Sequence, residues 1–161
     1  MKNGFLKIGV LIVFIISIIY ILMKGKKVSR GIRNNNPFNL NKGHIAWNGE
    51  IEGTDPRFSV FVDMKSGIRA GLINLYKGYF ARGLTLRAMI NKYAPASDNN
   101  DVDAYIKAIT KWTGVGALQV PVKAKWLHVA WAILYHENGM QVKSLSELEE
   151  IVKVCNLTYY L

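Results

Sequence analysis

Apolar residues recur at helical spacing through most of the chain beyond residue 65. This period predicts five helices, over residues 66–82, 85–93, 101–113, 121–136 and 145–155. Gly83, Gly114 and Gly139 stand where three of these helices should end, because glycine readily adopts the left-handed conformation of a helix stop. Ser146 and Glu149 predict a capping box for the last helix.

Residues 34–63 show a different pattern. Residues 34–52 are rich in Asn, Gly and Pro and lack a helical period, which predicts turns and short strands. Residues 57–63 alternate as a strand does, and we expect Phe58, Val60 and Val62 on one face. The predicted fold class is α+β, helix-dominated, with a small β-sheet near the front of the domain.

The first 23 residues carry a long apolar run. Residues 8–23 contain no charged side chain, and residues 5–23 contain only Lys7, a length that spans a bilayer. A cleaved signal peptide is the alternative, but the run ends in Met-Lys-Gly-Lys-Lys without a small-residue cleavage site. We therefore predict one N-terminal transmembrane helix within residues 1–23 that contacts the lipid bilayer through residues 5–23, a basic linker over 24–33 and a globular domain over 34–161.

The net charge of +10 is unevenly distributed. Residues 1–30 hold six basic residues and no acidic ones, which leaves fifteen basic and eleven acidic residues, a net +4, for the remainder. So small an excess over the globular part argues against nucleic acid as a partner. The single cysteine, Cys155, and the absence of zinc-ligand spacing predict no disulfide, no metal and no cofactor.

Several short motifs follow one another along residues 30–142. They are Arg30-Gly-Ile-Arg-Asn-Asn-Asn-Pro-Phe-Asn39, Trp47-Asn-Gly49, Asp55-Pro-Arg-Phe58, Gly67-Ile-Arg-Ala70, Tyr93-Ala-Pro-Ala-Ser-Asp-Asn99 and His136-Glu-Asn-Gly139. This set resembles a phage family of small virion-associated and lysozyme-like proteins. The resemblance implies association with phage particles, where capsid or other virion proteins are candidate partners, or a role in lysis, together with action on peptidoglycan glycan strands. Combined with the predicted anchor, it predicts a protein of an internal virion membrane or the host inner membrane that acts in host entry or lysis.

The end of one predicted helix carries a second resemblance. Residues 132–139 are similar to the helix end at which lysozyme-like lytic transglycosylases carry their catalytic glutamate. In those enzymes this helix precedes the sheet, whereas here the predicted sheet lies upstream. The resemblance implies a lysozyme-like domain in which Glu137 is the general acid/base that cleaves the MurNAc–GlcNAc β-1,4 bond.

General acid catalysis at a sugar bridge requires a carboxyl group that keeps its proton near neutral pH. The negative end of a helix and an apolar surface, which Trp126, Trp131 and Tyr135 could supply, both disfavour the charged form of such a group. The alternative is that Glu137 faces solvent beside a glycine stop. A lytic transglycosylase needs only one such group, whereas a muramidase needs a second carboxylate, for which Glu50 and Asp55 are candidates.

Other side chains suit a glycan groove. Asn34, Asn36 and Asn39 offer amide donors and acceptors to sugar hydroxyl groups, or else they only form turns. Trp47, Tyr93 and Tyr135 could stack on sugar rings, or else they belong to the core. We predict a peptidoglycan-degrading phage enzyme, either a lytic transglycosylase or a muramidase, and the alternative is a non-catalytic virion membrane protein that binds glycan or capsid partners.

Overall fold

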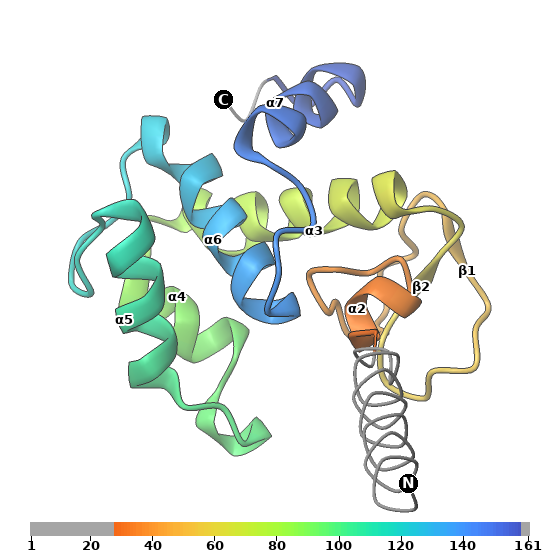
Figure 1. Ribbon diagram of the computed structural model, residues 1–161, viewed down its shortest axis with the longest axis horizontal. Helices are drawn as coiled ribbons and strands as arrows, with labels where there is room; N and C mark the ends of the chain where they lie inside the picture. The colour runs from red at the N-terminus through yellow and green to blue at the C-terminus, as the bar shows by residue number, and fades with distance from the viewer. Residues whose placement is uncertain (1–27, 159–161) are drawn as a thin grey trace, which may run out of the picture.

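The computed structural model describes residues 28–158 and shows a helix-dominated α+β fold (Figure 1). Its elements are α2 (Arg30–Arg33), β1 (Glu50–Ile51), β2 (Val60–Phe61), α3 (Met64–Gly78), α4 (Leu86–Tyr93), α5 (Val102–Thr113), α6 (Trp126–Asn138) and α7 (Leu145–Val154). Short 3-10 helices lie at Phe80–Arg82, Ala96–Asp98 and Lys123–Lys125. Within the expected linker, residues 30–33 form α2, which packs against α6.

Helix α6 is the centre of the domain. It contacts α2, α3, α5 and α7, and most of its side chains are buried, as expected for a helix that is apolar on nearly every face. Figure 1 shows α6 crossing α3, with α4 and α5 on one side and α2 with the two strands on the other. The end of α6 that carries Glu137 is therefore close to residues from both halves of the chain.

The sheet is small and antiparallel, with Glu50 opposite Phe61 and Ile51 opposite Val60. The strand predicted over residues 57–63 exists as β2, and burial alternates along it, with Ser59 and Phe61 buried and Phe58, Val60 and Val62 on the more exposed face. Phe61 is only 1% exposed, while Val62 is 60% exposed. The backbone of residues 34–40 covers this strand, because the N–H of Phe61 donates to the carbonyl oxygen of Asn34, and that contact turns Phe61 inward.

Most helix ends lie where the sequence predicts them. The side chains of Thr85 and Asp101 cap α4 and α5, and Gly114 and Gly139 adopt the left-handed conformation at the predicted stops of α5 and α6. The first long helix is shorter than predicted, because α3 ends at Gly78 and the left-handed Gly83 follows the separate 3-10 helix at Phe80–Arg82.

One predicted helix start and one predicted capping box are wrong. Helix α6 begins at Trp126 rather than residue 121, because residues 123–125 form a 3-10 helix. The capping box of α7 consists of Ser144 and Glu147, each of whose side chains accepts from the other's backbone N–H, and not of Ser146 and Glu149.

The predicted fold class needs one correction. It combined a lysozyme-like α+β domain with a transmembrane helix, yet among residues 28–158 no helix has the length and apolar character needed to cross a bilayer. The segment for which that helix was expected, residues 5–23, lies outside the described residues.

Candidate functional site

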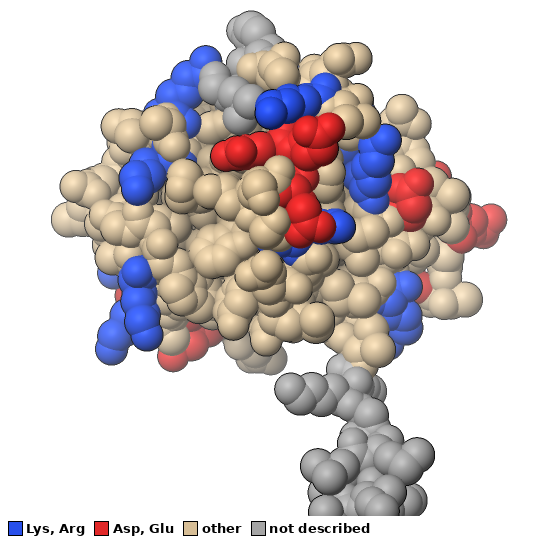
Figure 2. All heavy atoms as spheres, turned by 45° about the horizontal axis from the view of Figure 1, so that its top comes forward, with Lys and Arg blue, Asp and Glu red and all other residues tan. Residues whose placement is uncertain are grey.

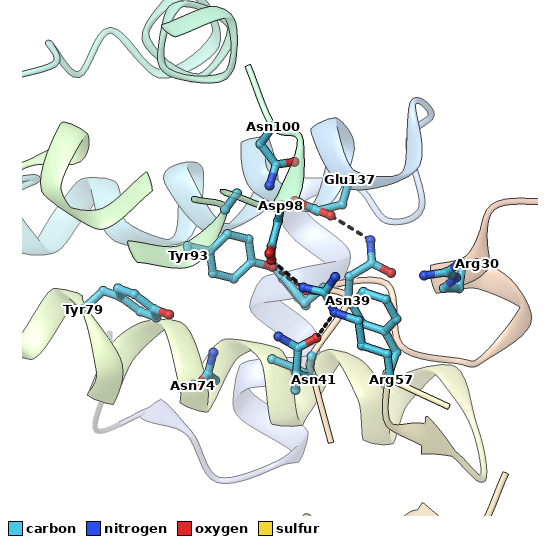
Figure 3. A pocket seen from close by; sticks show the side chains of 14 residues that line it. Arg30, Asn39, Asn41, Arg57, Asn74, Tyr79, Tyr93, Asp98, Asn100 and Glu137 are labelled. Atoms are coloured by element: carbon cyan, nitrogen blue, oxygen red, sulfur yellow. Dashed lines mark hydrogen bonds and ion pairs between the residues drawn. The ribbon is translucent and has the colours of Figure 1, made fainter. Parts of the chain in front are cut away.

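A polar groove with a volume of about 330 Å³ opens where the irregular N-terminal segment meets the helices. Figure 3 shows Asn39 and Asn41 on one wall, Tyr93, Asp98 and Asn100 on another, and Glu137 at the end of α6. The residues that line the groove are Arg30, Phe38, Asn39, Leu40, Asn41, Arg57, Phe58, Asn74, Tyr79, Tyr93, Ala94, Asp98, Asn100 and Glu137. Four of these side chains are amides, which can both donate and accept hydrogen bonds.

Glu137 is half-buried in the last turn of α6, and both of its carboxylate oxygens accept hydrogen bonds. The Tyr105 hydroxyl donates to Oε1 over 2.7 Å, and Nδ2 of Asn39 donates to Oε2 over 2.7 Å. Asn39 and Glu137 are 98 residues apart in the chain. The carboxylate is therefore fixed in direction by one donor from α5 and one from the N-terminal segment.

Tyr105 remains a hydroxyl donor under ordinary conditions. Burial, and then the neighbouring negative charge of Glu137, raise the pKa of Tyr105 well above its usual range. Its ring stacks on His136, with ring centroids 3.7 Å apart. Burial lowers the pKa of His136, so this imidazole is mainly neutral at pH 7 and adds little charge beside Glu137.

Asn39 holds its place in the groove through a turn with positive φ. Its φ is 49°, and its backbone N–H donates to the carbonyl oxygen of Asn36 over 2.9 Å. Asparagine tolerates this left-handed conformation better than most residues. The amide oxygen of Asn39 is buried and makes no hydrogen bond with the described part of the chain. The donor half of the amide is used, and the acceptor half is left unpaired.

The two motifs at Arg30–Asn39 and His136–Gly139 lie in contact. The Oδ1 atom of Asn138 accepts from the Ser29 hydroxyl over 2.9 Å, and its Nδ2 donates to the carbonyl oxygen of Pro37 over 2.8 Å. A Cβ atom at Gly31 would lie 2.8 Å from the same Asn138 oxygen, so glycine is needed for this close approach. These contacts bring Asn39 to Glu137.

Tyr93 also lines the groove, from the end of α4. Its hydroxyl donates to the carbonyl oxygen of Phe38, and its ring meets that of Tyr79 edge to face, with centroids 6.0 Å apart. Burial and the nearby Glu137 carboxylate raise the pKa of Tyr93 well above its usual range. The hydroxyl is already engaged, so Tyr93 presents mainly ring surface to the groove.

Asn34, Asn36 and Asp55 are buried and do not line the groove. The Asn36 amide donates to the carbonyl oxygens of Leu40 and Ser59 and accepts from the N–H of Leu40, which fixes the loop. The Asn34 amide donates to Asp55 over 2.8 Å. These side chains therefore shape the segment that carries Asn39.

The remaining predicted site residues also lie outside the groove lining. Trp47 is half-buried against the core, and its backbone N–H donates to the Glu50 carboxylate over 3.1 Å in the turn before β1. Tyr135 belongs to an aromatic cluster on α5 and α6, with its ring centroid 4.8 Å from that of Trp112. Of the predicted residues, the structure brings together Glu137, Asn39 and Tyr93.

The groove contains a second carboxylate that the sequence reasoning missed. Asp98 pairs with Arg57, whose Nε donates to the amide oxygen of Asn41 over 3.1 Å (Figure 3). Asn74 and Asn100 were also missed. No sequence pattern distinguishes Asn74 from the other polar residues of α3 or relates it to Glu137. Asp98 lies within the motif Tyr93–Asn99 and Asn100 directly follows it, so this motif could have indicated both residues.

The surface charge gives no single basic face in the view that Figure 2 shows. Lys and Arg side chains form separate groups there, interspersed with Asp and Glu. Among residues 28–158, no group of three or more His, Cys, Asp or Glu side chains is arranged to hold a metal ion.

With this geometry in view, comparison with known proteins places the chain among bacteriophage proteins. It is 32% identical over 129 residues to "Protein P5" of Pseudoalteromonas phage PM2, a match that covers 77% of this chain and 80% of that protein. The chain therefore belongs to the family of this P5 protein. No protein-family model matches the chain.

Proposed function

We propose that this phage protein cleaves the MurNAc–GlcNAc β-1,4 bond of peptidoglycan glycan strands, with Glu137 as the general acid/base. The observation that carries the proposal is the position of Glu137, whose two oxygens are held by Tyr105 and Asn39 on the wall of a polar groove. A fixed carboxyl group within reach of a bound sugar bridge is the minimum requirement for glycoside cleavage.

The hydrogen-bond partners of Glu137 suit both of its protonation states. A tyrosine hydroxyl can donate to a carboxylate and can also accept from a carboxylic acid. Asn39 donates through Nδ2 as the structure stands, while its buried amide oxygen has no partner within residues 28–158. A half-turn of this amide would present an acceptor to a protonated Glu137. Both oxygens of Glu137 can therefore keep a hydrogen-bond partner whether the carboxyl group is charged or protonated.

The other groups of the groove match the chemistry of an amino-sugar polymer. Hydroxyl and N-acetyl groups need neutral donors and acceptors, which the amides of Asn39, Asn41, Asn74 and Asn100 provide. Tyr79 and Tyr93 add ring surface on which a sugar can lie. A transglycosylase would need no further group, whereas a hydrolase would need a carboxylate to position water, and Asp98 is the lining residue of that type.

The test uses the full chain with purified peptidoglycan sacculi, and released products are analysed by mass spectrometry. Wild type is expected to release muropeptides, and Glu137→Gln is expected to reduce the rate by a factor of about 10² to 10⁴. Glutamine can keep both hydrogen bonds once the Asn39 amide turns, so unchanged thermal unfolding will show that the fold is intact. Glu150→Gln, at an exposed position on α7, is the matched control.

A second candidate function is a virion protein that binds glycan without cutting it. The observation that favours it is that the hydrogen bonds of Glu137 also join the N-terminal segment and α5 to α6. In that case wild type would sediment with sacculi and release no product.

Cleavage that survives in Glu137→Gln would show that another group is the catalyst. A product lighter by one water than a hydrolysed muropeptide would identify a transglycosylase.

A further inference from the structure

The loop between α5 and α6 exposes several apolar side chains to solvent. Leu118, Val120 and Val122 are 79%, 49% and 65% exposed, at alternate positions of one segment. Trp112, in the last turn of α5, is 36% exposed. Figure 1 shows this loop on the side of the molecule opposite α2 and the strands. We call residues 116–122 the apolar loop. Exposed apolar groups gathered in one place commonly mark a binding surface.

The backbone of the apolar loop is fixed by hydrogen bonds. The carbonyl oxygens of Ala117 and Gln119 accept from the backbone N–H groups of Arg87 and Leu86, over 2.8 and 2.9 Å, at the start of α4. The Gln119 side chain also accepts from the N–H of Gly116 over 2.7 Å. The loop therefore presents its apolar side chains on a rigid support and loses little conformational entropy when they are buried.

Lysines predominate among the charged residues around the apolar loop. Residues 104–136 contain four lysines, Lys107, Lys111, Lys123 and Lys125, and no acidic residue. Lys111, Lys123 and Lys125 are exposed beside the loop. Asp103 precedes this stretch, and its carboxylate is paired with Arg87 over 2.8 Å. A complementary partner has an apolar interior that can bury the side chains of the apolar loop and a negatively charged surface that can bind the lysines.

We propose that the apolar loop inserts into the surface of an anionic phospholipid bilayer. Leu118, Val120 and Val122 enter the boundary between headgroups and acyl chains, while Lys111 and Lys123 bind lipid phosphate groups. Trp112 is of the residue type enriched at this depth. The loop protrudes, as the high exposure of Leu118 shows, and so suits a deformable lipid surface. The proposal is independent of catalysis at Glu137.

The test places a reporter on the loop itself, within the full chain. Cys155→Ser removes the free cysteine, and Leu118→Cys then carries an environment-sensitive NBD fluorophore. Vesicles of phosphatidylcholine alone are compared with vesicles that also contain phosphatidylglycerol. Anionic vesicles are expected to shift the emission to the blue, and high salt is expected to reverse the shift. The same label at Ile45→Cys, which is 62% exposed in the loop before β1, should stay in water.

Charge variants test the role of the lysines. Lys111→Gln combined with Lys123→Gln is expected to lower the ratio of inserted to water-exposed label about 25-fold, because each lysine near an anionic surface contributes about a fivefold factor. Lys153→Gln, at an exposed position on α7, is the control. An unshifted label at position 118 on chains that sediment with anionic vesicles would overturn the proposal. A blue shift that rises with protein concentration without vesicles would identify a second copy of the chain as the partner instead.

Discussion

Glu137 illustrates how much one side chain depends on residues distant in sequence. Its helix supplies the position, but both donors to its oxygens come from elsewhere, Tyr105 from α5 and Asn39 from the N-terminal segment. The short motif around Glu137 was sufficient to single it out. It gave no indication of Tyr105, because nothing in the spacing of two helical residues 32 positions apart signals a hydrogen bond.

Removal of the Tyr105 hydroxyl should show whether this residue positions the Glu137 carboxylate or only packs against its neighbours. Tyr105→Phe keeps the ring stacked on His136 but leaves one oxygen of Glu137 without its donor. We expect the free energy of unfolding to fall by about 1 to 3 kcal/mol and glycan cleavage to fall at least tenfold. Urea unfolding and product release would measure the two effects.

Tyr93→Phe is the matched variant, since it also loses a hydroxyl bond, to the Phe38 carbonyl oxygen rather than to Glu137. It should lose comparable stability while the pH dependence of cleavage stays as in wild type. If both variants lose activity in proportion to stability alone, Tyr105 has no positioning role.

The candidate site was predicted in part. Glu137, Asn39 and Tyr93 line the groove, and a motif or a run of polar residues had indicated each of them. Asn34 and Asn36 come from the same run as Asn39, yet their amides are used within the loop. Sequence alone could not separate them, because the direction of each side chain depends on turns at Asn35 and Asn39, which have positive φ.

At the scale of elements, α3 lies unusually close to the N-terminal segment. A Cβ atom at Gly67 would lie 1.7 Å from the carbonyl oxygen of Asn35, and one at Gly71 would lie 2.1 Å from the Phe38 ring. These glycines let the backbone of residues 35–38 rest directly on the helix. The position of Asn39 in the groove wall depends on this close contact between residues 35–38 and α3.

Gly67→Ala should therefore be strongly destabilising. The obstructing atom belongs to the backbone and cannot rotate away, so we expect a loss of about 2 to 4 kcal/mol in the free energy of unfolding. Gly78→Ala, in the same helix, meets only the Asn74 amide oxygen at 3.9 Å and should be neutral or stabilising by up to about 1 kcal/mol. Chemical denaturation of both variants tests this, and equal effects would contradict it.

The elements themselves differ in how well the sequence predicts them. Helices α4 and α5 begin at capping side chains and end near a proline or a glycine, so local chemistry defines them. The strand at Val60–Phe61 is only two residues long, which is too short for alternation to identify its buried side. Its orientation depends on the covering loop at residues 34–40, a long-range contact that no local pattern reveals.

At the scale of the whole molecule, Asp55 connects segments around the groove. It accepts from the Asn34 amide and from the backbone N–H groups of Arg57 and Phe58, and Arg30 lies 3.6 Å away. These donors, chiefly the N–H of Phe58, lower the pKa of Asp55 from 3.8 to about 2. Because the folded state holds the carboxylate charged, Asp55 stabilises the fold above about pH 4, and this stabilisation is lost as pH falls toward 2.

Asp55→Asn should lower the free energy of unfolding at pH 7. Between about pH 4 and pH 2 that free energy should fall less steeply with decreasing pH than it does in wild type. Urea midpoints recorded across this range are the measurement. Glu147, whose pKa is also lowered to about 2, by Lys143 and Ser144 in the capping box of α7, contributes a decline of the same sign. Glu147→Gln therefore serves as the comparison, and a slope identical in wild type and Asp55→Asn would refute the role of Asp55.

The contact between Asn39 and Glu137 has a consequence for synthesis. A ribosome makes residues 30–39 early and residues 134–138 near the end of translation, yet neither segment forms the groove without the other. The nascent chain thus has no assembled pocket until α6 emerges from the exit tunnel. If the pocket cuts cell wall, any product that ends before residue 137 lacks the proposed general acid/base and is expected to be inactive.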